Sequence, residues 1–161
     1  MEMNGSERIG AKREAVYAAL NDPEILKASL PGCQELEKVS DTEFHATIVV
    51  KVGVIKATFK MVGTLMDLDP PNGYTLRGEG KGGMAGFAKG SAKVSLEADG
   101  DATILHYTVA ADIGGKLAQL GARLINSTAM KFAEEFFGNF SRAVAGETPA
   151  GAAAAGAAAT A

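Results

Sequence analysis

The chain has 161 residues, which is enough for one domain with a hydrophobic core. Its 16 Lys and Arg against 19 Asp and Glu give a net charge of −3, which argues against a general nucleic-acid-binding protein. The one cysteine, Cys33, excludes an internal disulfide and a cysteine-rich zinc site, and the two histidines, His45 and His106, leave little material for a histidine-based metal centre.

The N-terminal third is predicted to contain one strand and two short helices. Residues 2–10 are expected to form the strand, residues 12–20 the first helix and residues 24–30 the second. Pro23 separates the two helices because the residue before a proline avoids helical backbone angles. Pro31 and Gly32 then turn the chain.

Strand patterns dominate residues 35–112. The clearest alternating segments are 43–52, 57–67, 74–80, 87–98 and 103–111. In the first of them Phe44 and Ile48 share a face opposite His45, and the apolar positions change from even to odd after Gly53, which predicts a hairpin turn there. Every connection within the sheet is of hairpin length, so we expect an antiparallel sheet.

A long helix is predicted over residues 115–144, with an apolar stripe that winds around it. Such a stripe is typical of a helix lying across a curved sheet. The fold class is therefore α+β, with a curved antiparallel sheet of about six strands wrapped around the C-terminal helix. The two surfaces cannot match along their whole length, so we expect a cavity between them.

The last segment, residues 147–161, consists mostly of Ala and Gly and has no large side chain to bury. It cannot offset the entropy of its own ordering. We therefore predict one domain over residues 1–146, followed by a flexible tail or linker over residues 147–161. No run of about 18 strongly apolar residues is present, and we expect a cytoplasmic protein.

The glycine-rich segment 78–90 does not have the spacing of a phosphate-binding loop, because no Gly-Lys-Ser or Gly-Lys-Thr follows it. The simpler interpretation is a connection between two strands. A second interpretation is that Met84 and Phe87 gate an opening into the cavity, since methionine adapts to varied apolar partners.

Few residues offer catalytic chemistry. His45 and His106 lie on the polar sides of their strands, and Asp67 and Asp69 end a strand before two prolines, so we expect all four at the surface. We expect Cys33 to be a small buried thiol. Arg77 is either a surface charge or the partner of an acidic group, and the sequence leaves this open. We therefore predict no catalytic residue and no metal ligand.

The main functional signal is a set of residues expected to converge between the sheet and the helix. One interpretation is an ordinary hydrophobic core. The other adds a pocket with few polar groups, which would suit a lipophilic ligand, and Tyr107 and Thr128 would offer hydroxyl groups to a ligand carbonyl. With the two loop residues, the candidate ligand-binding residues are Phe59, Met61, Leu65, Leu76, Met84, Phe87, Leu105, Tyr107, Leu117, Leu120, Leu124 and Thr128.

Three segments in order resemble one known family: Leu30-Pro31-Gly32-Cys33, the run from Val52 to Phe59, and the run from Gly114 to Gly121 continuing to Phe136-Phe137. Together they resemble the family of carbon monoxide dehydrogenase G subunits, within the START-like, helix-grip superfamily, over about residues 1–145. The resemblance implies a helix-grip fold with a deep apolar cavity, outside the catalytic core of the dehydrogenase.

The resemblance also implies partners: carbon monoxide dehydrogenase or a related molybdenum hydroxylase, and the inner face of the cytoplasmic membrane, which the protein would contact peripherally. The leading hypothesis is a non-enzymatic carrier that binds a lipophilic molecule, a respiratory quinone such as menaquinone, with no covalently bound cofactor and no nucleic-acid partner. One alternative is a docking or assembly factor without a ligand. Another is an enzyme of the same superfamily, such as a cyclase or hydrolase.

Overall fold

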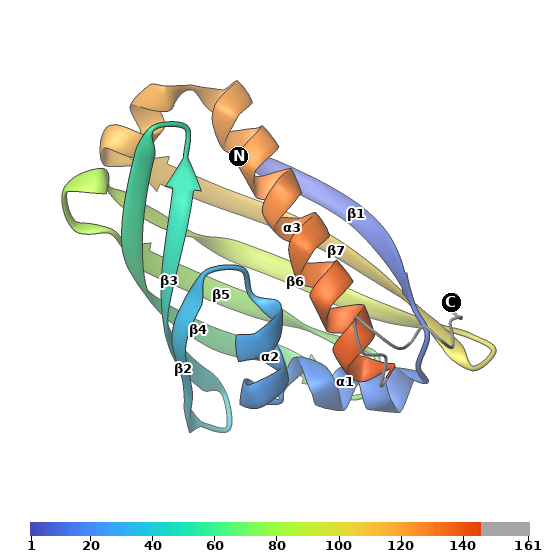
Figure 1. Ribbon diagram of the computed structural model, residues 1–161. Coiled ribbons are helices and arrows are strands. Elements are labelled where there is room, and N and C mark those ends of the chain that lie inside the picture. Colours follow the sequence, from blue (N-terminus) through green and yellow to red (C-terminus); the bar gives the residue numbers. More distant parts are fainter. Residues whose placement is uncertain (146–161) are drawn as a thin grey trace.

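The computed structural model describes residues 1–145, which form one antiparallel sheet, three α-helices and two short 3₁₀ helices (Figure 1). The elements in chain order are β1 (Glu2–Ile9), α1 (Arg13–Leu20), α2 (Pro23–Ser29), β2 (Cys33–Ser40), β3 (Glu43–Val52), β4 (Ile55–Asp69), β5 (Gly73–Lys81), η1 (Gly83–Ala85), β6 (Phe87–Asp99), β7 (Ala102–Gly114), η2 (Gly115–Leu120) and α3 (Ala122–Val144). The predicted tail over residues 147–161 lies outside the described residues.

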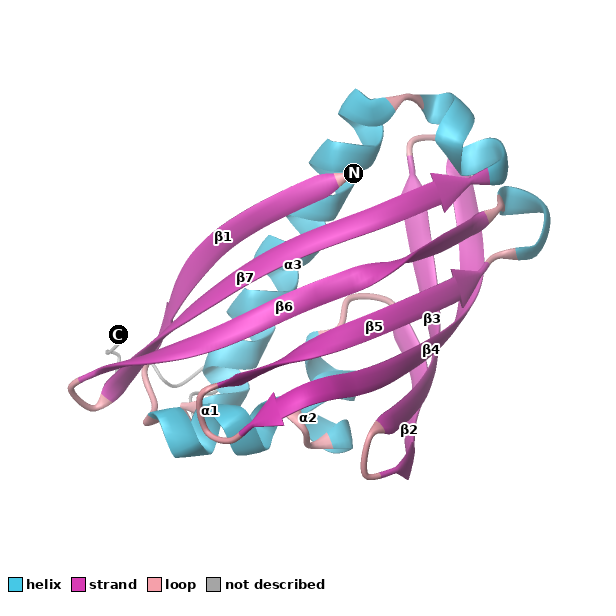
Figure 2. Cartoon of the chain, turned by 180° about the vertical axis from the view of Figure 1, so that it is seen from behind, coloured by secondary structure: helices cyan, strands magenta, loops and turns pink. Residues whose placement is uncertain are grey.

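The sheet has seven strands in the order β1-β7-β6-β5-β4-β3-β2, and every pair is antiparallel. It curves around α3, and α1 and α2 close one end of the curve (Figures 1 and 2). The predicted α+β class, with a curved sheet around the C-terminal helix, is confirmed.

The expectation that every sheet connection is a hairpin is wrong for β1. This strand pairs with β7, which follows it by about a hundred residues, so that Met3 lies opposite Val109. Helices α1 and α2 then carry the chain across to the other edge, where β2 pairs with β3. Such a distant pairing leaves no local pattern in the sequence.

The two short helices form where the sequence predicted them. Val16, Ala19 and Leu20 form the buried face of α1. Proline occupies the first turn of α2, and the Asp22 carboxylate accepts a hydrogen bond of 2.9 Å from the backbone N–H of Glu24. This cap begins the second helix where the first has ended.

The predicted single helix over residues 115–144 is wrong at its N-terminal end. Residues Gly115–Leu120 form the 3₁₀ helix η2, and α3 begins only at Ala122. The break is at Gly121, whose φ of 94° and ψ of 151° are open only to glycine. Leu117 and Leu120 therefore belong to a separate turn beside the sheet.

Candidate functional site

The face of the sheet turned toward α3 carries the apolar side chains that sequence alternation assigned to it. Phe44, Ile48 and Val52 of β3 are buried, as are Phe59 and Leu65 of β4. Because side chains alternate across a strand, His45 and its polar neighbours point away from the helix. The inward face is therefore an apolar wall opposite α3.

The apolar residues that were predicted to converge between the sheet and the helix fall into two clusters. The larger cluster lies where α1 and the C-terminal half of α3 meet the sheet and contains Leu65, Leu105, Phe137 and Phe140, with Leu76 and Tyr107 packed against it. The smaller cluster lies beside η2. Its buried residues are Val52, Ala57, Phe59 and Leu117, and Met61, Leu120 and Leu124 pack against them.

Small residues occupy the inward face between the two clusters. Gly63 of β4 lies opposite Gly78 of β5, and Gly78 lies opposite Gly90 of β6. A Cβ atom added at Gly78 would meet no atom outside its immediate chain neighbours within 4 Å. This position lies on the same face as Tyr74 and Leu76, so open space adjoins the sheet at its centre.

The first half of α3 is less buried than its second half. The buried residues of α3 are Phe137 and Phe140, both in its second half. Leu124 and Thr128, one and two turns into the helix, remain partly accessible. The first turns of α3 are thus less buried than its second half.

Two hydroxyl groups were predicted to meet a ligand carbonyl. The Tyr107 hydroxyl lies over Gly5 of β1, where an added Cβ atom would be 2.6 Å from it. The Tyr107 ring stacks on Phe137 with 5.3 Å between ring centroids, and burial, with the charges of Glu7 and Glu134, raises the pKa of its phenol. A neutral phenol can donate a hydrogen bond to a carbonyl. The Thr128 hydroxyl donates a hydrogen bond to the Leu124 carbonyl at 2.8 Å. In this arrangement the hydroxyl can accept a hydrogen bond from a ligand but cannot donate one to it.

Of the twelve predicted ligand-binding residues, two are placed apart from the inward face. Met84 lies in η1 with 82% of its surface exposed. Phe87 has the outward parity of β6, and its ring lies over Gly114: a Cβ at that glycine would be 2.2 Å from Cε2 of Phe87. The other ten fall in or against the two clusters, except Thr128, which is half-buried on α3.

The residues predicted from sequence did not include the glycines that leave the space open, or Phe137 and Phe140 in the larger cluster. Gly63 and Gly78 fall on the apolar parity of their strands, and a glycine inside a strand often marks a close approach or a ligand. That signal was available in the printed sequence. Phe137 and Phe140 were not among the candidates, because the candidate residues on the helix ended at Thr128.

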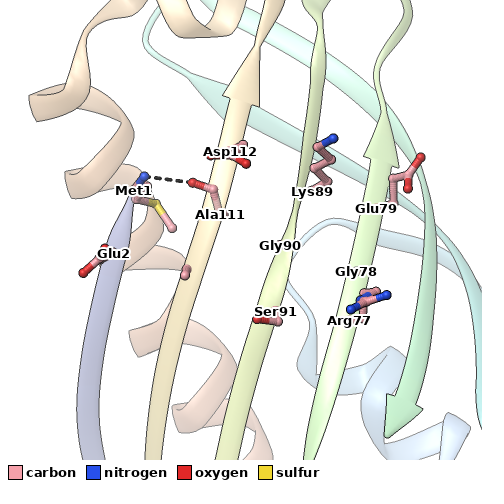
Figure 3. Close-up of a pocket in the computed structure, with 11 residues that line it drawn as sticks. Met1, Glu2, Arg77, Gly78, Glu79, Lys89, Gly90, Ser91, Ala111 and Asp112 are labelled. Atoms are coloured by element: carbon pink, nitrogen blue, oxygen red, sulfur yellow. Dashed lines mark hydrogen bonds between the residues drawn. The ribbon is translucent and has the colours of Figure 1, made fainter.

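A second concavity lies on the opposite face of the sheet, with a volume of about 520 Å³ (Figure 3). It crosses β1, β7, β6 and β5, and its side chains are mostly charged. Glu79, Lys89 and Asp112 stand opposite one another on three neighbouring strands. Within residues 1–145 none of these three, nor Arg77, forms an ion pair within 4 Å. The pocket is therefore polar, unlike the inward face.

The groups that the sequence analysis weighed for catalysis lie at the surface or lack activation. His45 pairs with Glu43, and His106 pairs with Glu97 at 2.9 Å, both on exposed side chains. Cys33 is half-buried rather than buried, and burial raises the pKa of its thiol, so the reactive thiolate is disfavoured. Over residues 1–145 no three His, Cys, Asp or Glu side chains are grouped to hold a metal ion.

The described helices also bear on membrane contact. None of them combines the length and the apolar character that crossing a bilayer would require.

Comparison with known proteins agrees with this architecture. Residues 5–145 match the CoxG family, described as the G subunit of carbon monoxide dehydrogenase. No curated protein sequence matches the chain.

Solved structures share the fold. A conserved protein from Geobacillus kaustophilus is 28% identical, with a TM-score of 0.85, and the alignment covers 91% of this chain and 96% of that one. A START superfamily protein from Mycobacterium smegmatis is 11% identical, with a TM-score of 0.68 over 89% and 96% of the two chains. The protein Ara h 8.0201 is 15% identical, with a TM-score of 0.62 over 91% and 99%. The fold is thus that of the START-like, helix-grip proteins.

Proposed function

The chain belongs to the CoxG family of carbon monoxide dehydrogenase G subunits, and from this premise we propose that it is a non-catalytic accessory protein that carries a lipophilic ligand. The partner is a molybdenum-containing carbon monoxide dehydrogenase or a related molybdenum hydroxylase. The ligand is a respiratory quinone such as menaquinone, held between the sheet and α3. Binding it couples the enzyme to the membrane, at whose inner face the protein acts peripherally.

The open space at Gly78 is the observation that supports this proposal most directly. The space is flanked by two apolar clusters rather than by charged groups, and a Cβ at Gly78 would meet nothing within 4 Å. Each CH₂ group moved from water into such surroundings contributes about 0.8 kcal/mol. One prenyl unit therefore contributes about 4 kcal/mol, before the cost of ordering the ligand.

The chemistry of the partner supports a quinone over other lipids. An enzyme that oxidises its substrate in the cytoplasm must pass electrons to a carrier that resides in the lipid. A protein that shields the prenyl tail and leaves the ring reachable would meet that need.

The proposal is tested by uptake of menaquinone from detergent solution. Leu124→Trp and Thr128→Phe place large side chains in the space and should abolish uptake while the fold is kept. Met130→Trp is the matched control, because Met130 lies on the same helix with 57% of its surface exposed. Normal uptake by both filled variants would show that the ligand does not bind between sheet and helix.

The charged pocket on the outer face favours a second candidate, a docking or assembly factor that needs no ligand. Arg77 and Lys89 there have no ion-pair partner within 4 Å among the described residues, so they are free to meet a protein surface. This candidate predicts that Leu124→Trp still co-purifies with the dehydrogenase and supports its membrane association. Loss of that association with Leu124→Trp, but not with Met130→Trp, would favour the carrier.

A further inference from the structure

Positive charge is concentrated at one end of the molecule. We define the loop end as residues 50–57, 80–87 and 113–127, which contain the β3–β4 turn, η1, and η2 with the first turns of α3. These segments carry five of the sixteen basic residues of the chain and no Asp or Glu. The rest of the chain therefore holds eleven basic residues and all nineteen acidic residues. The basic residues are Lys51, Lys56, Lys81, Lys116 and Arg123.

The three segments are separate in sequence but packed together. A Cβ at Gly53 would lie 2.9 Å from Cδ2 of Leu124, and one at Gly115 would lie 2.5 Å from Cα of Gly86. Figures 1 and 2 show the β3–β4 turn, η1 and η2 at the same end, away from α1 and α2. The five basic residues therefore lie at one end of the folded protein, and this end has no acidic residue in the three segments.

The most exposed large apolar side chains of the described residues project from the same end. Val54, at the tip of the β3–β4 turn, is 97% exposed, and Met84 in η1 is 82% exposed. Other exposed large apolar side chains reach at most 57%. None of the five basic side chains forms an ion pair within 4 Å in residues 1–145.

We propose that the loop end docks on an anionic lipid bilayer, with Val54 and Met84 entering the headgroup layer and the basic side chains contacting lipid phosphates. Apolar tips framed by lysines suit this surface, because apolar insertion and attraction to anionic lipid add together. An acidic protein surface would pair with the basic side chains, but it offers no layer for two highly exposed apolar side chains to enter.

The loop end also borders the proposed ligand space. The smaller cluster contains Ala85, Leu120 and Leu124 from its segments, and Gly82 lies against the Phe59 ring, where a Cβ would be 2.8 Å from Cε1. A lipophilic ligand would therefore pass between bilayer and protein at the docked surface. This route rests on the proposed function, whereas docking itself does not require the ligand.

The test is flotation of the full chain with vesicles that contain no quinone. Vesicles of phosphatidylcholine with phosphatidylglycerol should bind the protein, vesicles of phosphatidylcholine alone should not, and added salt should weaken binding. Each basic residue near an anionic surface strengthens binding by about fivefold. Lys51→Glu combined with Lys56→Glu should therefore weaken it by at least about twenty-fivefold.

The apolar part is tested with Val54→Asp combined with Met84→Asp, which should weaken binding by at least about tenfold. The control for charge is Lys27→Glu in α2, and the control for an exposed valine is Val39→Asp, at 43% exposure in β2. Both controls should bind as the unsubstituted chain does. Because Val54 and Met84 are so exposed, their substitution should leave the melting temperature unchanged.

The outcomes separate docking from ligand carriage when menaquinone uptake from detergent solution is measured in parallel. Vesicle binding lost in the loop-end variants, with uptake retained, supports the docking surface. Vesicle binding by the unsubstituted chain without any uptake also supports docking but contradicts the proposed ligand. Failure to bind anionic vesicles, or equal binding by all variants, overturns the docking proposal. If the loop-end variants bind vesicles normally but no longer bind the dehydrogenase, the docking proposal is overturned in favour of an acidic protein partner.

Discussion

Gly78→Leu tests whether the space beside the sheet is open in the folded protein. A Cβ at Gly78 meets no atom within 4 Å outside its immediate chain neighbours, so the new side chain has room. Replacing glycine inside a strand gains about 0.5–1 kcal/mol from the lower entropy of the unfolded chain. Partial burial of the leucine contributes about 1 kcal/mol more.

We therefore expect the free energy of unfolding to rise by about 1–2 kcal/mol, which raises the melting temperature by roughly 2–8 °C for a domain of this size. Urea titration and a thermal melt both measure this. The same variant should lose menaquinone uptake because leucine fills the space.

Gly90→Leu is the matched control, since Gly90 lies opposite Gly78 on the next strand. A Cβ there would lie 2.1 Å from the backbone oxygen of Ala110, which is fixed in the sheet. This variant should be destabilised by about 1–3 kcal/mol or more. If Gly78→Leu were destabilised as strongly as Gly90→Leu, the space would not exist.

Three further predictions concern stability. Phe140→Ala should lower the free energy of unfolding, measured by urea titration, by about 3–5 kcal/mol, because Phe140 is 0% exposed in the larger cluster. A smaller loss than that of Met130→Ala would refute this placement of Phe140. Gly121→Ala should cost about 1–3 kcal/mol by the same measurement, because φ is 94° there, while Gly10→Ala, with open space around its Cβ and an ordinary φ, should cost far less. Burial raises the pKa of Tyr74, so the contribution of this residue to the free energy of unfolding should be constant up to the ordinary tyrosine pKa of about 10 and should fall above it, as the unfolded chain ionises first. Tyr74→Phe should reduce that fall in denaturation curves at high pH, and an unchanged slope would contradict the burial.

Alternation along the strands predicted most of the sheet, because residues on one parity had to face α3. The turn at Gly53 and the inward placement of Phe59 and Leu65 follow directly from that pattern. The pairing of β1 with β7 could not be predicted in the same way, because it depends on contacts between distant segments. The break at Gly121 was missed because a single glycine is tolerated in many helical patterns, and only the positive φ shows that the helix ends there.

The candidate site was predicted as a set of apolar residues, and the structure divides that set into two clusters with small residues between them. Apolar side chains show where a core forms. The core stays open where Gly63 and Gly78 have no side chain. A glycine in a strand is a weaker signal in the sequence than a run of alternating apolar residues. Met84 and Phe87 were predicted to gate the cavity, but Met84 lies exposed in η1 and the strand parity of Phe87 turns it outward.

The central claim is that this CoxG family member carries a quinone between its sheet and α3. Its most direct test is organic extraction of the purified full-length protein, followed by mass spectrometry and an ultraviolet spectrum of the extract. The account predicts a quinone in near-stoichiometric amount, absent from Leu124→Trp prepared in the same way. A protein that is empty as purified, and that takes up no added menaquinone, would contradict it.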